Sequence, residues 1–209
     1  MKICEIFHSL QGEGIWIGAT SVFVRTSGCN LDCKWCDTRY AREEGREMAL
    51  DDILSEVARF KCRHVCVTGG EPLAQKDITK LINRLLGAGY HVTVETNGSL
   101  PIEELACDER MTISMDLKCP SSGMKDRMLL ENLELLGPND QLKFVIADDT
   151  DYIYAREVVR ERTLVCEVVM QPEGGKDIKE LAEKVLKDKL NVRVLPQLHK
   201  LIWGDRRGV

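Results

Sequence analysis

Short apolar runs alternate with amphipathic segments along almost the whole chain, and this alternation constrains the fold more than any other feature. Runs rich in Val, Ile, Thr and Phe predict strands at residues 3–8, 20–25, 64–68, 90–95, 111–116, 141–146, 164–170 and 191–197. Apolar residues at helical spacing predict helices over 50–58, 78–86 and 178–186, with weaker patterns over 127–136 and 150–161. Strands separated by helices are typical of a parallel sheet with right-handed crossovers, so we expect an α/β fold.

The length of the chain limits how this sheet can close. The sequence has 209 residues, no low-complexity linker and no internal repeat, so we expect a single domain over residues 1–209. A complete eight-unit (β/α) barrel takes about 250 residues. We therefore predict an open or truncated (β/α) barrel with a mostly parallel sheet.

Charge and hydropathy exclude several classes of protein. Lys and Arg number 29 against 34 Asp and Glu, and the net charge of −5 disfavours a protein that grips nucleic acid through many phosphates. No apolar run approaches the roughly 20 residues of a membrane span, and the first residues lack the apolar core of a signal peptide. We expect a cytoplasmic protein that binds neither nucleic acid nor membrane.

Nine cysteines are many for such a chain in a reducing compartment, where clustered thiols indicate metal binding or catalysis before disulfides. Three of them, Cys29, Cys33 and Cys36, stand at C-x3-C-x2-C spacing in a loop rich in Gly, Asn and Asp. We interpret the other six as packing residues, namely Cys4, Cys62, Cys66, Cys107, Cys119 and Cys166.

Three thiolates within eight residues favour an iron–sulfur cluster. A structural zinc ion needs four ligands, and no second pair of cysteines stands nearby. A [4Fe–4S] cluster held by three Cys leaves one iron open to bind a cofactor or a substrate. The spacing therefore favours cluster chemistry, with a zinc site as the alternative.

Other polar motifs follow the predicted strands. They occupy residues 68–72 (TGGEP), 95–98 (ETNG), 114–120 and 171–172. Because the carboxyl ends of parallel strands meet at one face of a sheet, we expect these motifs and the Cys loop to converge on one active site.

The C-x3-C-x2-C loop, with Gly69-Gly70-Glu71-Pro72 after the next strand, resembles the radical S-adenosylmethionine (SAM) superfamily. Further features narrow the resemblance to the 7-carboxy-7-deazaguanine synthase (QueE) family. These are the segment Leu10-Gln11-Gly12-Glu13-Gly14, Arg25 four residues before the first Cys, and Cys36-Asp37-Thr38. The resemblance covers essentially the whole chain.

This resemblance implies a carbon–nitrogen lyase of 7-deazapurine biosynthesis, with either queuosine or archaeosine as the end of the pathway. Members of the family convert 6-carboxy-5,6,7,8-tetrahydropterin to 7-carboxy-7-deazaguanine with loss of ammonia. The implied cofactors are a [4Fe–4S] cluster, SAM and Mg2+, and the reduced cluster cleaves SAM to start radical chemistry. The resemblance also implies an electron donor such as a flavodoxin or ferredoxin, and a homodimer.

The resemblance places the cofactors on numbered residues. Cys29, Cys33 and Cys36 would hold the cluster, and SAM would contact Trp35, Cys36, Asp37, Gly70, Glu71, Ser114, Asp116, Lys118, Gln171 and Pro172. The run from Ser114 to Lys118 departs from the shorter Ser-Pro-Lys run of some members, so which of its side chains reaches SAM stays open. For Trp35, the alternative is an apolar cover over the cluster.

The resemblance also implies a substrate site made of Leu10, Gln11, Gly12, Glu13, Arg25 and Thr68. Arg25 would pair with the substrate carboxylate, and a structural ion pair is the alternative. Thr38 matches the family's Mg2+ ligand. One hydroxyl cannot hold Mg2+ alone, so we expect substrate oxygens to complete that site, with a turn cap as the alternative. Residues 198–209 would form a C-terminal tail near the active site, in which His199 and Val209 have no assigned role.

Two other functions remain open from the residues alone. One is a radical SAM activase that generates a glycyl radical on a partner protein, which would need a broad, flat partner groove. The other is a zinc-stabilised binding module, which would contain zinc and no iron.

Overall fold

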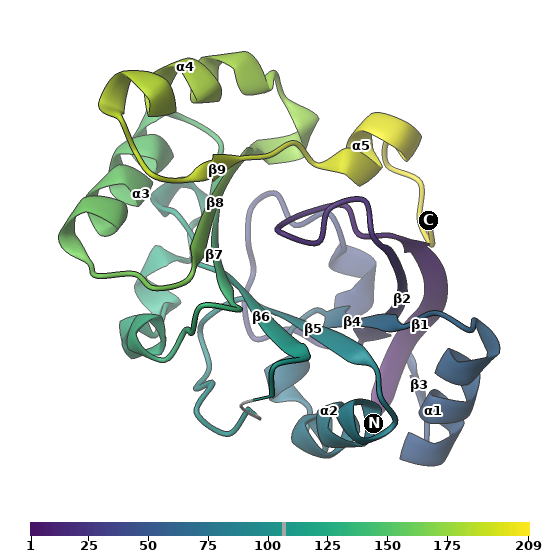
Figure 1. Ribbon diagram of the computed structural model, residues 1–209. Coiled ribbons are helices and arrows are strands. Elements are labelled where there is room, and N and C mark those ends of the chain that lie inside the picture. The colour runs from purple at the N-terminus through teal and green to yellow at the C-terminus, as the bar shows by residue number, and fades with distance from the viewer. Residues whose placement is uncertain (106–107) are drawn as a thin grey trace.

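The computed structural model describes residues 1–105 and 108–209, and its strands form one nine-stranded sheet in the order β3-β1-β2-β4-β5-β6-β7-β8-β9 (Figure 1). The strands are β1 (Lys2–Leu10), β2 (Thr20–Thr26), β3 (Arg46–Glu47), β4 (His64–Gly69), β5 (His91–Thr96), β6 (Met111–Asp116), β7 (Gln141–Ile146), β8 (Glu167–Pro172) and β9 (Arg193–Val194). Strand β1 is antiparallel to β2 and β3, and every other neighbouring pair is parallel. The sheet curls without closing, with β3 and β9 at its two edges, which confirms the predicted open α/β barrel.

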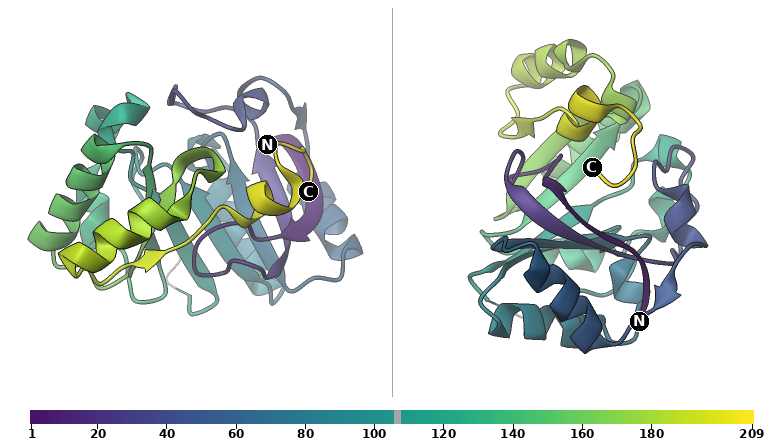
Figure 2. Two further views of the ribbon diagram at one scale, coloured as in Figure 1. Left: turned by 90° about the horizontal axis from the view of Figure 1, so that it is seen from above. Right: turned by 90° about the vertical axis from the view of Figure 1, so that its right-hand side faces the viewer.

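Helices cover the outer face of the curved sheet (Figures 1 and 2). They are α1 (Leu50–Arg59), α2 (Ile78–Gly87), α3 (Asp149–Glu161) and α4 (Ile178–Asp188). The short α5 (Leu198–Trp203) lies instead beside the loop after β1. Helix α2 packs on β5, α3 on β7, and α4 on β8 and β9. The buried residues of α1, α2 and α4 belong to the apolar stripes that predicted these helices, because those stripes face the strands.

The segment between β6 and β7 departs from the sequence prediction. The helix predicted over 127–136 is wrong, since short 3-10 turns form at Lys125–Arg127 and Leu130–Glu134. The buried side chain of Asn132 explains the difference. Its amide donates to the carbonyl of Leu100 at 2.8 Å and its oxygen accepts from Ile102 N at 3.3 Å. These bonds hold the turn at Leu130–Glu134 against the loop that follows β5.

Other differences lie at the ends of elements. The predicted strands at 164–170 and 191–197 are shorter, as β8 begins at Glu167 and β9 has two residues. The sequence did not predict β3 or α5. Each is short, with two and six residues respectively, so neither shows a clear hydrophobic period.

The cysteines outside the C-x3-C-x2-C loop fit the packing interpretation where the structure describes them. Cys66, Cys119 and Cys166 are buried, and Cys4 and Cys62 are half-buried. The prediction for Cys107 lies outside the described residues.

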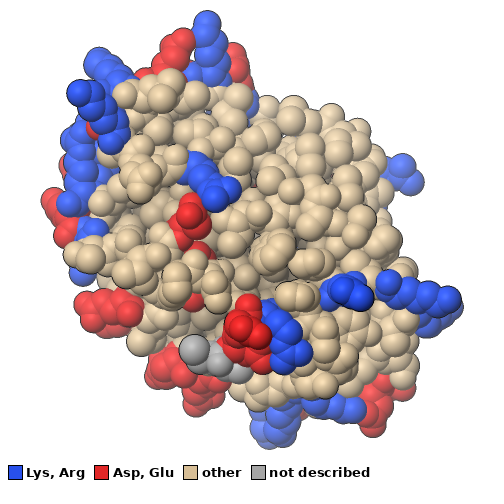
Figure 3. Space-filling view, viewed as in Figure 1, with Lys and Arg blue, Asp and Glu red and all other residues tan. Residues whose placement is uncertain are grey.

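Within the described part of the chain, no helix has both the length and the apolar character to cross a bilayer. Figure 3 shows basic and acidic side chains interspersed around the edge of one face, without a broad patch of a single sign.

Candidate active site

Strand pairing brings polar residues together toward the carboxyl ends of the parallel strands. The registered pairs are Arg25 with Thr68, Glu95 with Ser114, Asp116 with Lys143, and Val145 with Gln171. All of these residues line one cavity of about 570 Å³. The sheet therefore places charged, amide and hydroxyl side chains from six strands around a single space, as the sequence predicted for its strand-end motifs.

The loop that follows β2 carries the three clustered thiols into the same cavity. Polar contacts to neighbouring loops hold it in place. Asn30 donates to Ser99 Oγ at 2.8 Å, and the backbone amide of Lys34 donates to the carbonyl of Ser122 at 3.1 Å. Because these two bonds lie on either side of Cys33, they hold that part of the loop against its neighbours.

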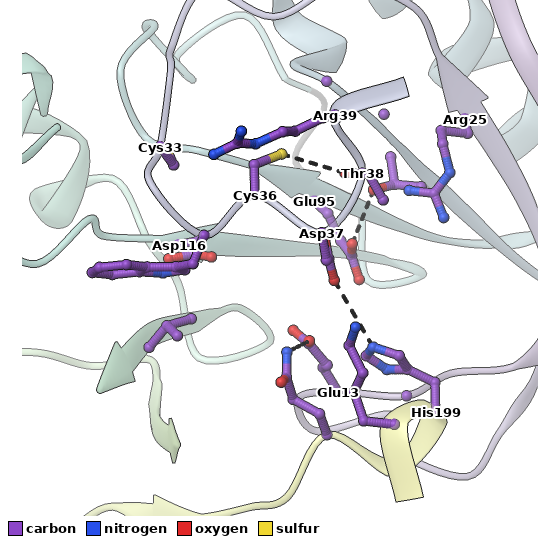
Figure 4. Close-up of a pocket in the computed structure, with 18 of the residues that line it drawn as sticks. Glu13, Arg25, Cys33, Cys36, Asp37, Thr38, Arg39, Glu95, Asp116 and His199 are labelled. Carbon is purple, nitrogen blue, oxygen red and sulfur yellow. Dashed lines mark hydrogen bonds and ion pairs between the residues drawn. The ribbon is translucent and has the colours of Figure 1, made fainter. Parts of the chain in front are cut away.

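Two of the thiols also have polar neighbours. Asn97 Nδ2 donates to Cys29 Sγ at 3.8 Å, and Thr38 Oγ1 lies 3.8 Å from Cys36 Sγ (Figure 4). Burial raises the pKa of the Cys33 thiol, while the Lys118 ammonium opposes that rise. A cation near the Cys33 sulfur favours the thiolate form that binds metal.

The three thiols fit a multi-iron cluster. Within residues 1–105 and 108–209, the structure contains no group of three or more His, Cys, Asp or Glu side chains that could hold a single metal ion. In a [4Fe–4S] cluster each Cys binds a different iron, so its thiols surround a volume instead of converging on a point. Cys29, Cys33 and Cys36 all line the cavity from one loop, which suits this arrangement.

Gly70 joins the GGEP turn to the Cys loop. A Cβ at position 70 would overlap the carbonyl oxygen of Gly28 and approach Cys29 Cβ to 2.8 Å. The amide of Glu71 donates to the same Gly28 carbonyl at 2.8 Å. The turn after β4 can therefore lie directly against the start of the Cys loop only because position 70 has no side chain.

Glu71 is fully buried and does not line the cavity. Its carboxylate accepts hydrogen bonds from Leu73 N at 3.0 Å, Thr96 Oγ1 at 2.9 Å and Asn97 N at 2.7 Å. Burial raises the pKa of this carboxyl, although the three hydrogen bonds oppose the rise. In this structure Glu71 ties the GGEP turn to the end of β5.

A buried ion pair crosses the cavity. Lys143 Nζ contacts the carboxylate of Glu13, whose other oxygen accepts from Gln197 Nε2 at 2.7 Å. Burial alone would raise the pKa of Glu13, but the charges of Lys143 and His199 outweigh burial and hold the pKa at about 2. Glu13 is therefore an anion fixed by residues from β7 and from the segment before α5.

Asp116 lies between two ammonium groups. Its Oδ2 is 2.9 Å from Lys118 Nζ and 3.6 Å from Lys143 Nζ, whereas Oδ1 has no hydrogen-bond partner in the described residues. Gln171 is fully buried, and neither of its amide atoms has a partner there. Buried polar atoms are nearly always paired, so these two side chains present acceptors and a donor suited to a bound ligand.

A second polar chain links the loop after β1 to β4 and β5. Gln11 Nε2 donates to Glu95 Oε1 at 3.0 Å, and Thr68 Oγ1 donates to Glu95 Oε2 at 3.0 Å. Gln11 Oε1 accepts from Gly12 N at 2.9 Å. Glu95 thus organises two residues that the resemblance assigned to the substrate.

Arg25 takes part in an ion pair and also lines the cavity. Its Nε donates to Glu5 Oε1 at 2.8 Å, and its side chain is 14% exposed. The bond to Glu5 uses Nε, on the inner edge of the guanidinium. The structural ion pair of Arg25 therefore uses a different nitrogen from the outer nitrogens that a substrate carboxylate would contact.

The C-terminal segment covers one side of the cavity. In Figure 1 the loop after β1 and α5 lie side by side, and Leu198 N donates to the carbonyl of Gly12 at 2.8 Å. A Cβ on Gly12 would overlap the ring of His199. Figure 4 shows Asp37 pointing toward His199, with Oδ2 4.0 Å from Nε2.

Most residues singled out from the sequence line this one cavity. They are Leu10, Gln11, Gly12, Glu13, Arg25, Cys29, Cys33, Trp35, Cys36, Asp37, Thr38, Thr68, Gly70, Ser114, Asp116, Lys118, Gln171, His199 and Val209. Glu71 and Pro172 do not line it.

Sequence reasoning missed two residues that carry much of the polar network. Lys143 and Gln197 line the cavity but belong to no motif named from the sequence, whereas Glu95 opens the strand-end motif ETNG, for which no role was assigned. Lys143 offered a signal, because a lysine inside the apolar run QLKFVI is unusual for a buried strand.

Comparisons with known proteins agree with this geometry. Residues 23–122 match the family model of the Radical SAM superfamily. The chain is similar to the 7-carboxy-7-deazaguanine synthase of Thermoplasma acidophilum, at 43% identity over 100% of both chains. It is 41% identical to the 7-carboxy-7-deazaguanine synthase of Methanospirillum hungatei, over 97% of this chain and 85% of the relative.

Solved structures support the fold. QueE from Escherichia coli is similar with a TM-score of 0.76 and 24% identity, over 93% of each chain. Streptococcus suis SuiB bound to S-adenosylmethionine is similar with a TM-score of 0.59 and 14% identity, over 81% of this chain and 48% of SuiB. At these identities the likeness shows a common architecture.

Proposed function

Because the chain belongs to the 7-carboxy-7-deazaguanine synthase family of radical SAM enzymes, we propose that it converts 6-carboxy-5,6,7,8-tetrahydropterin to 7-carboxy-7-deazaguanine with loss of ammonia. The reaction would make it a carbon–nitrogen lyase. One observation carries the proposal. A single cavity is lined both by the three clustered thiols and by Gln11, Glu13 and Arg25, so an iron–sulfur centre and a carboxylated pterin could meet there.

Cys29, Cys33 and Cys36 would hold a [4Fe–4S] cluster with one iron free for SAM. When bound, the cluster and SAM supply a one-electron reduction and the abstraction of a hydrogen atom. The chain positions them: Gly70 lets the turn after β4 approach the Cys loop, and Glu71 fixes that turn from behind. For SAM we favour Asp116 and Gln171 as contacts, since both keep unpaired polar atoms within the cavity wall.

The polar edge of a pterin carries donors and acceptors that must be paired when it is buried. Glu13, Gln11 and Glu95 offer acceptors and an amide on one side of the cavity. Lys143 keeps Glu13 ionised, so Glu13 could accept from the ring N–H groups. Arg25, from the neighbouring strand, could receive the substrate carboxylate on its outer nitrogens.

Thr38 is the proposed Mg2+ ligand. Its hydroxyl lines the cavity beside Cys36 and two residues from Tyr40. Mg2+ prefers six oxygens, so substrate and water would supply the others, and the ion would bind together with the substrate.

The remaining proposals concern the protein as a whole. We expect one domain over residues 1–209, a cytoplasmic location, a homodimer, and a flavodoxin or ferredoxin as electron donor. The activase and zinc-module alternatives lose support, because the relatives that match the full chain are named as synthases.

Anaerobic turnover tests the proposal directly. Reconstituted protein, a reductant, SAM, Mg2+ and the carboxylated tetrahydropterin should yield 7-carboxy-7-deazaguanine, identified by mass and absorbance. Protein that contains about four Fe per chain and still gives no such product would refute the assignment.

A further inference from the structure

Four side chains from four separate segments form one cluster beside the cavity. They are Glu5 of β1, Arg25 of β2, Tyr40 after the Cys loop, and Arg207 near the C-terminus. Glu5 is the centre. Its Oε1 accepts from Arg25 Nε and from Tyr40 Oη, both at 2.8 Å, and its Oε2 lies 3.4 Å from Arg207 Nε.

Arg207 is held on three sides. Its guanidinium lies 3.7 Å from the centre of the Tyr40 ring, and Nη2 is 2.7 Å from Glu44 Oε2. A planar cation stacked on an aromatic ring and paired with two carboxylates is well constrained for a terminal segment. Arg207 therefore fastens this segment to β1 and to the residues that follow the Cys loop.

The fastened segment covers the cavity. Gly204, Asp205, Arg206, Gly208 and Val209 all line it, whereas Arg207 is the residue of this stretch that does not. Its neighbours on both sides thus line the cavity, while the Arg207 side chain contacts Glu5, Glu44 and Tyr40. The same Glu5 that receives Arg207 also fixes Nε of Arg25, which lines the cavity with Val209.

We propose that Glu5, Tyr40 and Arg207 are positioning residues, which aim the guanidinium of Arg25 at a substrate carboxylate and anchor residues 204–209 over the cavity. The inference rests on the proposed function for its carboxylated substrate. Glu5 holds Arg25 by its inner nitrogen, so the outer pair of nitrogens stays available for a bidentate carboxylate. Arg207 contacts the other oxygen of Glu5, and it thereby links residues 204–209 to the Glu5–Arg25 pair.

Two measurements separate the two roles. The first is binding of 6-carboxy-5,6,7,8-tetrahydropterin and of 5,6,7,8-tetrahydropterin, which lacks the carboxylate, to holoenzyme with SAM and Mg2+ but no reductant. Glu5→Gln should raise the Kd of the carboxylated pterin about tenfold and leave the other Kd nearly unchanged. Tyr40→Phe should act in the same direction by about threefold, because it removes one hydrogen bond and keeps the ring.

The second measurement is the rate at which carboxypeptidase removes Val209 from the full chain, followed by mass spectrometry. Arg207→Ala should speed removal about tenfold, and Tyr40→Phe should not, since its ring still supports Arg207. Arg84→Ala is the matched control. Its side chain is 44% exposed against 42% for Arg207, and it pairs with Asp51 on the surface, far from these contacts in the chain.

Each result decides a part of the inference. An equal loss of affinity for both pterins in Glu5→Gln, or unchanged removal of Val209 in Arg207→Ala, would overturn the corresponding role. If wild-type protein binds neither pterin, the proposed function fails and the role for Arg25 fails with it. The carboxypeptidase rates then still establish or refute Arg207 as the anchor of the segment.

Discussion

Lys143, in the middle of β7, forms an ion pair with Glu13, which lies 130 positions earlier in the chain. Both side chains are largely shielded from solvent, at 8% and 14% exposed. The pair joins the loop after β1 to the far half of the sheet across the cavity. Breaking this ion pair should therefore change both the stability of the fold and the geometry of the site.

Replacing one partner should unfold the protein at a lower temperature. Lys143→Met leaves the Glu13 carboxylate buried beside Gln197 without its cation, which should cost about 3–5 kcal/mol and lower Tm by about 6–20 °C. Thermal unfolding followed by circular dichroism measures the change. Lys143→Met combined with Glu13→Gln should recover most of the loss, and a double variant as unstable as the single one would contradict the pairing.

Acid should weaken the fold through Glu13. Its pKa falls from 4.5 to about 2 on folding, so its contribution to stability is complete above pH 4.5 and is lost as pH falls toward 2. Urea unfolding across this range should show a shallower pH dependence in Glu13→Gln than in wild type. Glu104→Gln, at an exposed position, should keep the wild-type slope. Identical slopes in all three proteins would count against an ionised Glu13.

Iron content should depend on the three loop thiols and not on the packing cysteines. Cys33→Ala should lower iron and sulfide well below about four of each per chain after anaerobic reconstitution. Cys62→Ala, at a half-buried cysteine outside the cavity, should keep wild-type content and absorbance. Full iron content in Cys33→Ala would remove Cys33 from the cluster.

A methyl group at position 70 should disturb the site without unfolding the chain. Gly70→Ala places Cβ against the Gly28 carbonyl, so the GGEP turn must move away from the Cys loop. We expect the Kd for SAM to rise about tenfold or more, measured by calorimetry. Gly87→Ala is the control, because a Cβ there meets no atom within 4 Å. Equal SAM affinity in both variants would mean that the close approach is not needed.

The sequence predicted the parts of the site that carry local motifs. Cys29, Cys33, Cys36 and Arg25 stood out because thiols at short spacing and a charge within an apolar strand are unusual. Lys143 and Gln197 did not, since their roles arise from strand register and from contacts across more than a hundred positions. Glu95 stood within the ETNG motif, but its bond to Gln11, 84 positions earlier, could not be predicted from that motif. Glu71 illustrates the opposite limit. Its motif pointed toward a ligand, but the backbone amides around it bind both of its oxygens.

The fold was predictable in outline for a related reason. Strands and helices whose hydrophobic pattern extends over many residues were predicted correctly, because burial against the sheet imposes that pattern. The segment near Asn132 was misjudged, since one buried amide with several backbone partners outweighs helical propensity there.

The distance in the chain between the Cys loop and Gln197 has a consequence during synthesis. Cys36 leaves the ribosome 161 residues before Gln197, the residue that closes the network around Glu13. At roughly 5–20 residues per second, that interval lasts about 10–30 s. For that time the three thiols lack the C-terminal segment that lines the cavity, and they are more open to oxidants and to stray metal ions. Loading iron late, or keeping these sulfurs reduced during translation, would protect them.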